Sequence, residues 1–179
     1  MIAHVCDPAK SGKDRGFALY ASTAFVPDAF GLCKWGAAPC YGQGACWGVV
    51  EAQWANPEAS RQSLVTLAAR AGFCFTLVPA ARYAMIPPTT AKLTKVDAKR
   101  LKRTTLPGWK DILIPGFGNA DGDVFTRSIL DLLRRMKHPA ARETNHNVLD
   151  AIGIALAVGR IVEGHAAARG VSLEHYEIT

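Results

Sequence analysis

The sequence predicts an α/β fold in which helices cover a mixed five-stranded sheet. Short apolar runs near the N-terminus have the length and composition of strands, and the first two are close enough to pair as a hairpin. Residues 47–78 follow a strand–helix–strand order, which implies two parallel strands joined by a right-handed crossover. Residues 145–169 form a long, mostly apolar helix that is expected to pack on the sheet.

Four of the strands are expected in the first third of the chain. Each is a run of apolar residues bounded by turn-forming Gly, Pro, Ser or Asp. The loop before the last of these strands, residues 36–46, contains three glycines and a proline. The four expected strands are residues 2–7, 16–23, 24–34 and 47–53.

A helix and a fifth strand follow. Asn56 is a suitable N-cap and Pro57 a suitable first residue of the helix, while Gly72 is well placed to end it. The fifth strand is expected at residues 73–78, before Pro79 stops it. This strand should lie parallel to the fourth.

We interpret the whole chain, residues 1–179, as a single domain, because its length suffices for one core of good size. Residues 84–142 are rich in Pro, Gly and basic side chains, and we interpret them as an insertion or a DNA-binding extension. Within them, an apolar stripe from Phe125 to Met136 predicts a helix capped by Asp123. The final helix is expected to end at Gly170.

The composition favours a water-soluble protein with a polyanionic partner. The net charge is +6, from 21 basic and 15 acidic residues. No apolar stretch is long enough to span a membrane, and residues 1–20 carry too many charges for a signal peptide. A cytoplasmic location is therefore expected, and the five cysteines are expected to be reduced thiols without the close pairs of a zinc site.

Three acids stand out because each lies at the end of an apolar run. Asp7 ends the first expected strand, Glu51 lies near the end of the fourth, and Asp150 lies in the first turns of the last helix. A carboxylate at the edge of a core is costly unless it is paired or binds a cation. Three such acids, far apart in sequence, predict one shared site for divalent cations.

Two motifs around these acids resemble a known family. The run DAIGIALA, which starts at Asp150, is similar to the final motif of RuvC-type Holliday junction resolvases, in the RNase H-like superfamily. The run VVEAQ around Glu51, followed by a polar loop and a helix rich in small residues, is similar to a second family motif, most of all in phage-borne members. The resemblance covers residues 1–83 and 143–162 well and residues 84–142 poorly.

The resemblance implies an RNase H-like five-stranded sheet with flanking helices and a homodimeric endodeoxyribonuclease that cuts branched DNA, such as Holliday junctions. A phage-encoded member would act in the host cytoplasm during DNA recombination and repair. The resemblance also implies two Mg²⁺ or Mn²⁺ ions per active site. Such ions prefer oxygen ligands, and two of them side by side promote the hydrolysis of a phosphodiester. Asp7 would bridge the ions, Glu51 would hold one and Asp150 the other.

The family pattern has a fourth ligand, Asp or His, three residues before the last acid, where this sequence has Asn147 beside His146. Both residues lie on the helix face of Asp150. Asn147 offers a neutral carbonyl oxygen to a metal, and His146 is a candidate ligand or catalytic proton donor. In the alternative reading, Asn145 or Thr144 caps the helix and His146 is merely part of its exposed first turn.

A basic run in the middle of the chain is the candidate DNA-binding surface. It holds seven basic residues against the single acid Asp97, a concentration of charge that suits contacts to phosphates. The alternative is an ordinary solvated face. The seven residues are Lys92, Lys95, Lys99, Arg100, Lys102, Arg103 and Lys110.

Two other functions remain open. One is a junction-binding module that cuts poorly, because the fourth ligand position is not acidic. The other is an RNase H-like nuclease with a different substrate, such as RNA in a hybrid.

Overall fold

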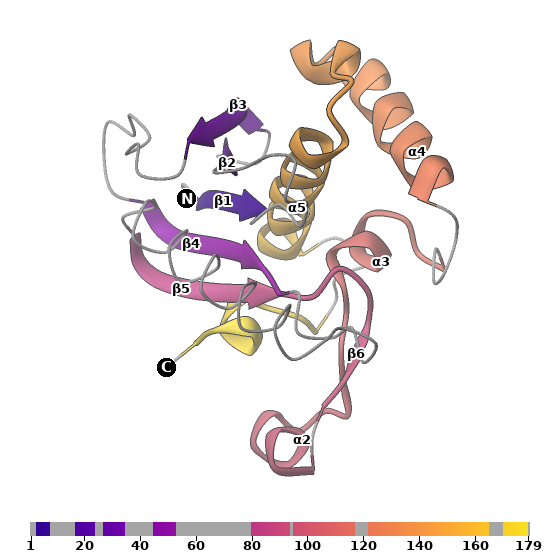
Figure 1. Cartoon of the computed structure of the whole chain (residues 1–179). Coiled ribbons are helices and arrows are strands. Elements are labelled where there is room, and N and C mark those ends of the chain that lie inside the picture. The colour runs from indigo at the N-terminus through magenta and orange to yellow at the C-terminus, as the bar shows by residue number, and fades with distance from the viewer. Residues whose placement is uncertain are drawn as a thin grey trace.

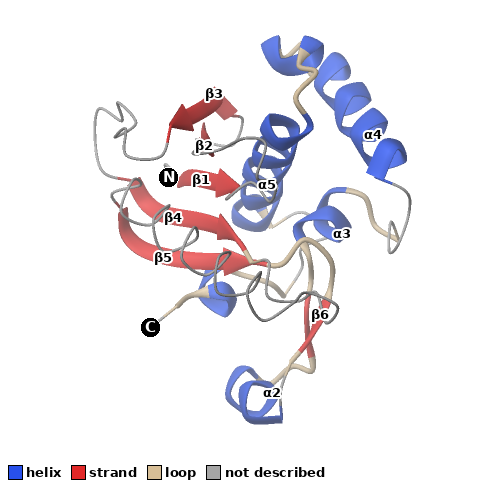
Figure 2. Cartoon of the chain, in the orientation of Figure 1, coloured by secondary structure: helices blue, strands red, loops and turns tan. Residues whose placement is uncertain are grey.

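A computed structural model of the chain is shown in Figure 1. It describes residues 3–7, 17–23, 27–34, 45–52, 80–93, 95–116, 122–164 and 170–178. The α/β architecture predicted from the sequence is confirmed, with strands forming a sheet and helices packed beside it (Figure 2). No helix in these ranges is long and apolar enough to cross a membrane.

The main sheet is mixed, with strand order β3-β2-β1-β4-β5. The apolar first strand, β1, is buried at every residue and pairs antiparallel with β2 and parallel with β4. β5 is parallel to β4. The strands are β1 (Ala3–Asp7), β2 (Phe17–Thr23), β3 (Pro27–Lys34), β4 (Ala45–Glu51) and β5 (Ala80–Ile86).

The described strand beside β4 is Ala80–Ile86, which follows the fifth strand expected at residues 73–78 and was not predicted from the sequence. The first half of β5 is exposed or half-buried and contains Arg82, which obscures the apolar pattern of a strand. Residues 73–78 and the helix expected at 57–71 lie outside the described residues.

The last helix, α5 (His146–Glu163), packs against β1, β2 and β3 and supplies much of the core. It ends earlier than expected. Gly164 adopts the left-handed conformation with φ 67°, and its N–H bonds to the carbonyls of Arg160 and Ile161, so this glycine, rather than Gly170, is the C-cap.

The helix α4 (Gly122–Arg135) buries Phe125, Ile129 and Leu133, the stripe that the sequence predicts. It begins one residue before Asp123, which therefore lies in its first turn and is not the expected cap. A short 3₁₀ helix, η1 (Pro139–Arg142), leads from α4 towards α5.

Residues 91–106 leave the body of the molecule as an arm and return to it. The arm contains β6 (Ala91–Lys92), α2 (Lys95–Leu101) and β7 (Thr105–Leu106), and it projects from the rest of the chain in Figure 1. We call residues 91–106 the basic arm. Its base is closed where Gly108 lies against the backbone of Thr89, so closely that a Cβ on Gly108 would stand 2.3 Å from Thr89 Cα.

The C-terminal segment closes the free side of β5. Its 3₁₀ helix, η3 (Leu173–Tyr176), leads to Ile178, whose N–H bonds to the carbonyl of Tyr83 at 3.1 Å. The Tyr176 hydroxyl donates to the carbonyl of Pro107 at 2.7 Å, next to the base of the arm. The segment thus protects a sheet edge and ties it to the arm.

Cys6 is disulfide-bonded in the structure, whereas Cys46 is an exposed free thiol. The expectation that all five cysteines are reduced is therefore wrong.

Candidate active site

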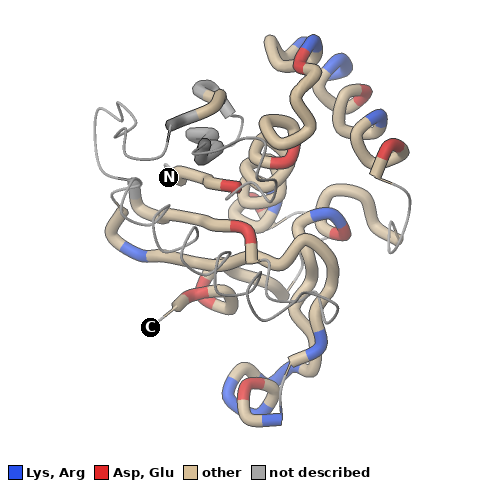
Figure 3. Tube along the Cα trace, viewed as in Figure 1, with Lys and Arg blue, Asp and Glu red and all other residues tan. Residues whose placement is uncertain are grey.

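The three acids meet at one end of the sheet. β1 and β4 run parallel with Cys6 opposite Val50, so the next residues, Asp7 and Glu51, end the two strands side by side. Asp150 comes from the second turn of α5, which packs on β1. Figure 3 shows acidic positions at the ends of β1 and β4 and on α5.

Asp7 is the most deeply buried of the three, with 3% of its surface exposed. Burial raises its pKa well above the ordinary value, and the negative charges of Glu51 and Asp150 raise the pKa further. A hydrogen bond with the Glu51 side chain acts in the same direction. The three acids thus lie close enough for their charges to interact.

Asp150 shares this environment from the helix side. Burial raises its pKa to about 7, the nearby charge of Lys110 opposes that shift, and the charge of Glu51 adds to it. Negative charges crowded into a poorly solvated site repel each other. A divalent cation relieves such repulsion because it is bound by the charged form of each acid.

The donors fit a hard divalent cation by their chemistry. All three acids offer oxygen ligands, and among the residues that the structure describes, Oδ1 of Asp7 is buried without a hydrogen-bond partner. Within those same ranges, no group of three His, Cys, Asp or Glu side chains already has the arrangement of a metal site. The carboxyl groups of Asp7 and Glu51 are instead hydrogen-bonded to one another. Such a bond requires a proton, which a bound cation would displace.

Lys110 lies at this site and not in the basic arm, where the sequence analysis grouped it. Its charge lowers the pKa of both Asp7 and Asp150. Its Nζ lies 5.2 Å from the ring centroid of Trp109 and 5.0 Å from that of Phe125, so two aromatic rings hold the ammonium in place. Among the residues that the structure describes, Lys110 is thus a basic residue that lies beside the acids.

Trp109 is a site residue that the sequence analysis missed. Its indole Nε1–H donates to Oε1 of Glu51 at 3.0 Å, and its side chain is fully buried. It opens the short helix α3 (Trp109–Leu113). The only local signal was an aromatic–basic pair directly after Pro107 and Gly108, within the segment interpreted as an insertion or a DNA-binding extension.

The first turn of α5 contains the two candidates for a fourth ligand. The side chain of Asn145 accepts a hydrogen bond from the backbone N–H of Asn147 at 3.0 Å, so the alternative reading of Asn145 as N-cap is confirmed. His146 is exposed, whereas Asn147 is buried one turn before Asp150. The catalytic and metal-binding roles of both residues stay predictions.

The other six basic residues of the run lie on the basic arm, whose positive charges are visible in Figure 3. Two of them make contacts within the protein: Arg100 pairs with Asp97 at 3.7 Å, and Arg103 donates to the carbonyl of Gly170. The remaining four are exposed lysines: Lys92, Lys95, Lys99 and Lys102.

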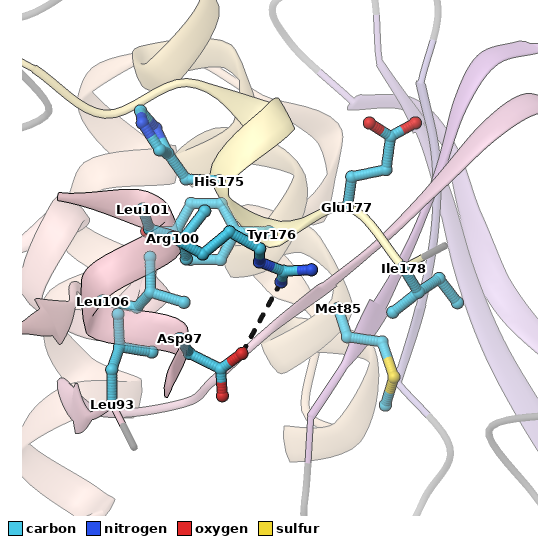
Figure 4. Close-up of a pocket in the computed structure, with 10 residues that line it drawn as sticks. All are labelled: Met85, Leu93, Asp97, Arg100, Leu101, Leu106, His175, Tyr176, Glu177 and Ile178. Atoms are coloured by element: carbon cyan, nitrogen blue, oxygen red, sulfur yellow. Dashed lines mark ion pairs between the residues drawn. The ribbon is translucent and has the colours of Figure 1, made fainter. Parts of the chain in front are cut away.

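A pocket of about 300 Å³ separates the basic arm from the C-terminal segment (Figure 4). None of the three acids lines it, so it is distinct from the candidate active site. Its lining residues are Met85, Leu93, Asp97, Arg100, Leu101, Leu106, His175, Tyr176, Glu177 and Ile178.

No protein-family model and no curated protein matches this sequence. Among solved structures, the chain is similar to the RuvC of Thermus thermophilus, with 12% sequence identity and a TM-score of 0.48. The similarity extends over 91% of this chain and 96% of that one. A similarity of this degree is a loose similarity of fold and does not indicate which reaction the protein catalyses.

Proposed function

We propose that this protein is a divalent-metal-dependent, structure-specific endonuclease that cuts branched DNA such as Holliday junctions. The observation that supports the proposal is the meeting of three largely buried carboxylates, from β1, β4 and α5, at one end of the sheet. Such a cluster is unfavourable for folding unless cations or protons neutralise it. The choice of branched DNA rests on the family resemblance of the motifs around Glu51 and Asp150.

The site residues have distinct roles in this proposal. Asp7, Glu51 and Asp150 would hold Mg²⁺ or Mn²⁺, with Asn147 as a further oxygen donor. When bound, two such ions supply an activated water and stabilise the leaving oxygen of the phosphodiester. Lys110 adds a fixed positive charge beside the acids, where a DNA phosphate would have to approach them.

The basic arm would bind the DNA backbone away from the acids. Its exposed lysines suit phosphate contacts, which fix the position of a duplex without reading its sequence. Recognition by backbone contacts and shape is what a junction-specific nuclease requires. A homodimer would present two such sites to the two strands that are cut.

The test is cleavage of an end-labelled four-way junction in the presence of Mg²⁺ or Mn²⁺. The parent protein should cut the junction, and chelation with EDTA should stop the reaction. Asp7→Asn should abolish cutting while junction binding, measured by gel shift with EDTA, stays close to the parent value. Cutting by Asp7→Asn at the parent rate would refute the proposed site.

A second candidate function is a junction-binding module that cuts poorly. The observation in its favour is Asn147, a neutral and buried residue one turn before Asp150. In this case the parent would bind the junction with high affinity but cut it only slowly. A linear duplex and an RNA–DNA hybrid, assayed beside the junction, would show whether the substrate belongs to another class.

A further inference from the structure

We propose that Trp109 is a positioning residue that orients the carboxylate of Glu51 for cation binding. This inference rests on the proposed function, because it assigns a role to Trp109 within the same site. The contact that carries it is the hydrogen bond from the indole Nε1–H to Oε1 of Glu51, at 3.0 Å between two buried side chains. The two residues lie 58 positions apart in the sequence.

The indole ring is fixed by its surroundings. It packs edge-to-face against Phe125, with ring centroids 5.0 Å apart and an interplanar angle of 75°. On another side it fills the space beside Gly153 of α5, where a Cβ would stand 2.4 Å from the ring atom Cζ3. Its backbone N–H donates to the carbonyl of Pro87 at 2.9 Å. A donor held on several sides can impose its direction on a flexible acceptor.

Glu51 needs such a constraint. The last torsion of a glutamate side chain is broad and roughly two-fold, so the carboxylate has no intrinsic preference for one orientation of its oxygens. A fixed donor to Oε1 restricts this rotation and leaves the second oxygen for another partner. Hydrogen bonds of this kind to metal-binding carboxylates typically change metal affinity by about 10–100-fold.

The same ring also links Glu51 to the helix that carries Asp150. Gly153 lies three residues after Asp150, on the same face of α5. Trp109 therefore contacts Glu51 through its indole N–H, and through its ring it contacts α5, the helix that carries Asp150. This explains why a glycine occupies position 153, since a larger side chain would force the ring away from α5.

The experiment compares Trp109→Phe with the matched control Trp47→Phe. Phenylalanine keeps most of the ring but removes the N–H. Trp47 is a buried tryptophan near the start of β4, four residues before Glu51, and its ring stacks under Arg82. Cation binding is measured by isothermal titration with Mn²⁺ alone, and cleavage is measured separately as a function of Mg²⁺ concentration.

Trp109→Phe should weaken Mn²⁺ binding about 10-fold or more and raise the half-maximal Mg²⁺ concentration for cleavage by a similar factor. Junction binding in EDTA should be unchanged, and Trp47→Phe should match the parent in both cation measurements. Equal Mn²⁺ affinity of Trp109→Phe and the parent would overturn the inference, while a parent that still binds Mn²⁺ and cuts DNA would leave the proposed function intact. A parent that neither binds Mn²⁺ nor cuts would refute both.

A second measurement covers the case in which Trp109→Phe does not fold. In the parent, the indole N–H resonance of Trp109 is assigned by through-bond NMR experiments, and it should change in Glu51→Gln, because the substitution alters its acceptor. Addition of Mg²⁺ should shift this resonance and leave that of Trp47 in place. A Trp109 resonance that responds neither to Glu51→Gln nor to Mg²⁺ would overturn the inference.

Discussion

Asp150 shows, at the scale of a single residue, how the site couples stability to ionisation. Its folded-state pKa is about 7, against an ordinary value of 3.8, mainly because of burial. Below pH 3.8 the group is protonated in both the folded and the unfolded state. Between pH 3.8 and about 7, the unfolded chain releases the proton of Asp150 more readily than the folded chain. The free energy of unfolding therefore falls as pH rises, and the stabilisation from the protonated Asp150 is lost above a pH of about 7.

We therefore expect the protein in EDTA to lose stability between pH 4 and pH 7, and Asp150→Asn to lose less. Because a tenfold ratio in proton affinity corresponds to ~1.4 kcal/mol, the difference should be on the order of a few kcal/mol. Urea unfolding at a series of pH values measures it. Mg²⁺ should restore stability above pH 7 in the parent and much less in Asp150→Asn. Identical pH dependence in the two proteins would contradict the assignment.

Lys110 yields a prediction that separates chemistry from binding. Lys110→Met removes the charge beside Asp7 and Asp150 but keeps most of the apolar stem that lies against Trp109 and Phe125. The single-turnover cleavage rate should fall about 100-fold, a typical loss for one fixed charge at a reacting phosphate. Junction affinity in EDTA should change little.

The matched control is Lys99→Met, on the exposed face of the basic arm. It should weaken junction binding and leave the single-turnover rate at saturating protein unchanged. If Lys110→Met behaved like Lys99→Met, Lys110 would be one more residue of the DNA-binding surface, as the sequence analysis had it.

The most distinctive property of the basic arm is its positive charge rather than its packing. It is a short helix held by two-residue strands, and none of the residues of that helix is buried. Such an element contributes little to the hydrophobic core, so we expect its role to be the binding of a partner. Its attachment at Gly108 and through Tyr176 keeps it in a defined place beside the body.

Replacing Lys95, Lys99 and Lys102 with Ala should weaken DNA binding and flatten its salt dependence. Each lost phosphate contact should reduce the slope of log affinity against log salt by about 0.9 on duplex DNA. Arg100 and Arg103 are retained because they contact Asp97 and Gly170 within the protein. Fluorescence anisotropy over a range of salt concentrations gives the slope, and an unchanged slope would mean that the arm is only a solvated surface.

The first turn of α5 is the second element with a testable role. If a carboxylate belongs one turn before Asp150, Asn147→Asp should raise cleavage at low Mg²⁺, because a charged oxygen binds a cation better than an amide carbonyl. If His146 has that role, His146→Ala should be the damaging change and Asn147→Asp should do little. Cleavage rates over a Mg²⁺ titration distinguish the two. Parent-like behaviour of both variants would leave three carboxylates as the whole site.

Elements from distant parts of the chain meet at one end of the sheet. β1 and β4 end there with Asp7 and Glu51, and α5 contributes Asp150. Trp109, at the start of α3, donates a hydrogen bond to Glu51. The C-terminal segment meanwhile covers the free side of β5, where Arg82 pairs with Glu174 and Glu177. Asp7 and Glu51 therefore lie at the carboxyl ends of β1 and β4, whereas the outer edge of β5 is covered by the C-terminal segment and protected from pairing with other chains.

At this scale we expect a homodimer. Sedimentation equilibrium should give twice the chain mass of 19.2 kDa, because paired cuts in a symmetric junction need two sites related by a two-fold axis. A mixed dimer of the parent and Asp7→Asn should nick one strand without resolving the junction. A strictly monomeric protein that still makes paired cuts would contradict this expectation.

The class of fold and the three candidate acids could both be predicted from local sequence patterns. Asp7 and Glu51 could be identified because a lone charge that ends an apolar run marks a strand end, which is a local pattern. Asp150 could be identified from its motif on an apolar helix. The strand Ala80–Ile86 beside β4 was not predicted, because Arg82 and its exposed neighbours weaken the local pattern and only pairing along β4 defines that strand.

The other residues beside the acids, Trp109 and Lys110, could be found only from the packing of distant segments. Trp109 reaches Glu51 across 58 positions, and no local periodicity encodes a contact at that separation. Lys110 looked like part of a continuous basic run, yet the chain turns back at Gly108 and places it beside Asp7 and Asp150 while the rest of the run stays on the arm. Local sequence patterns determine strands, helices and their ends, whereas the neighbours of a buried charge depend on how distant segments pack.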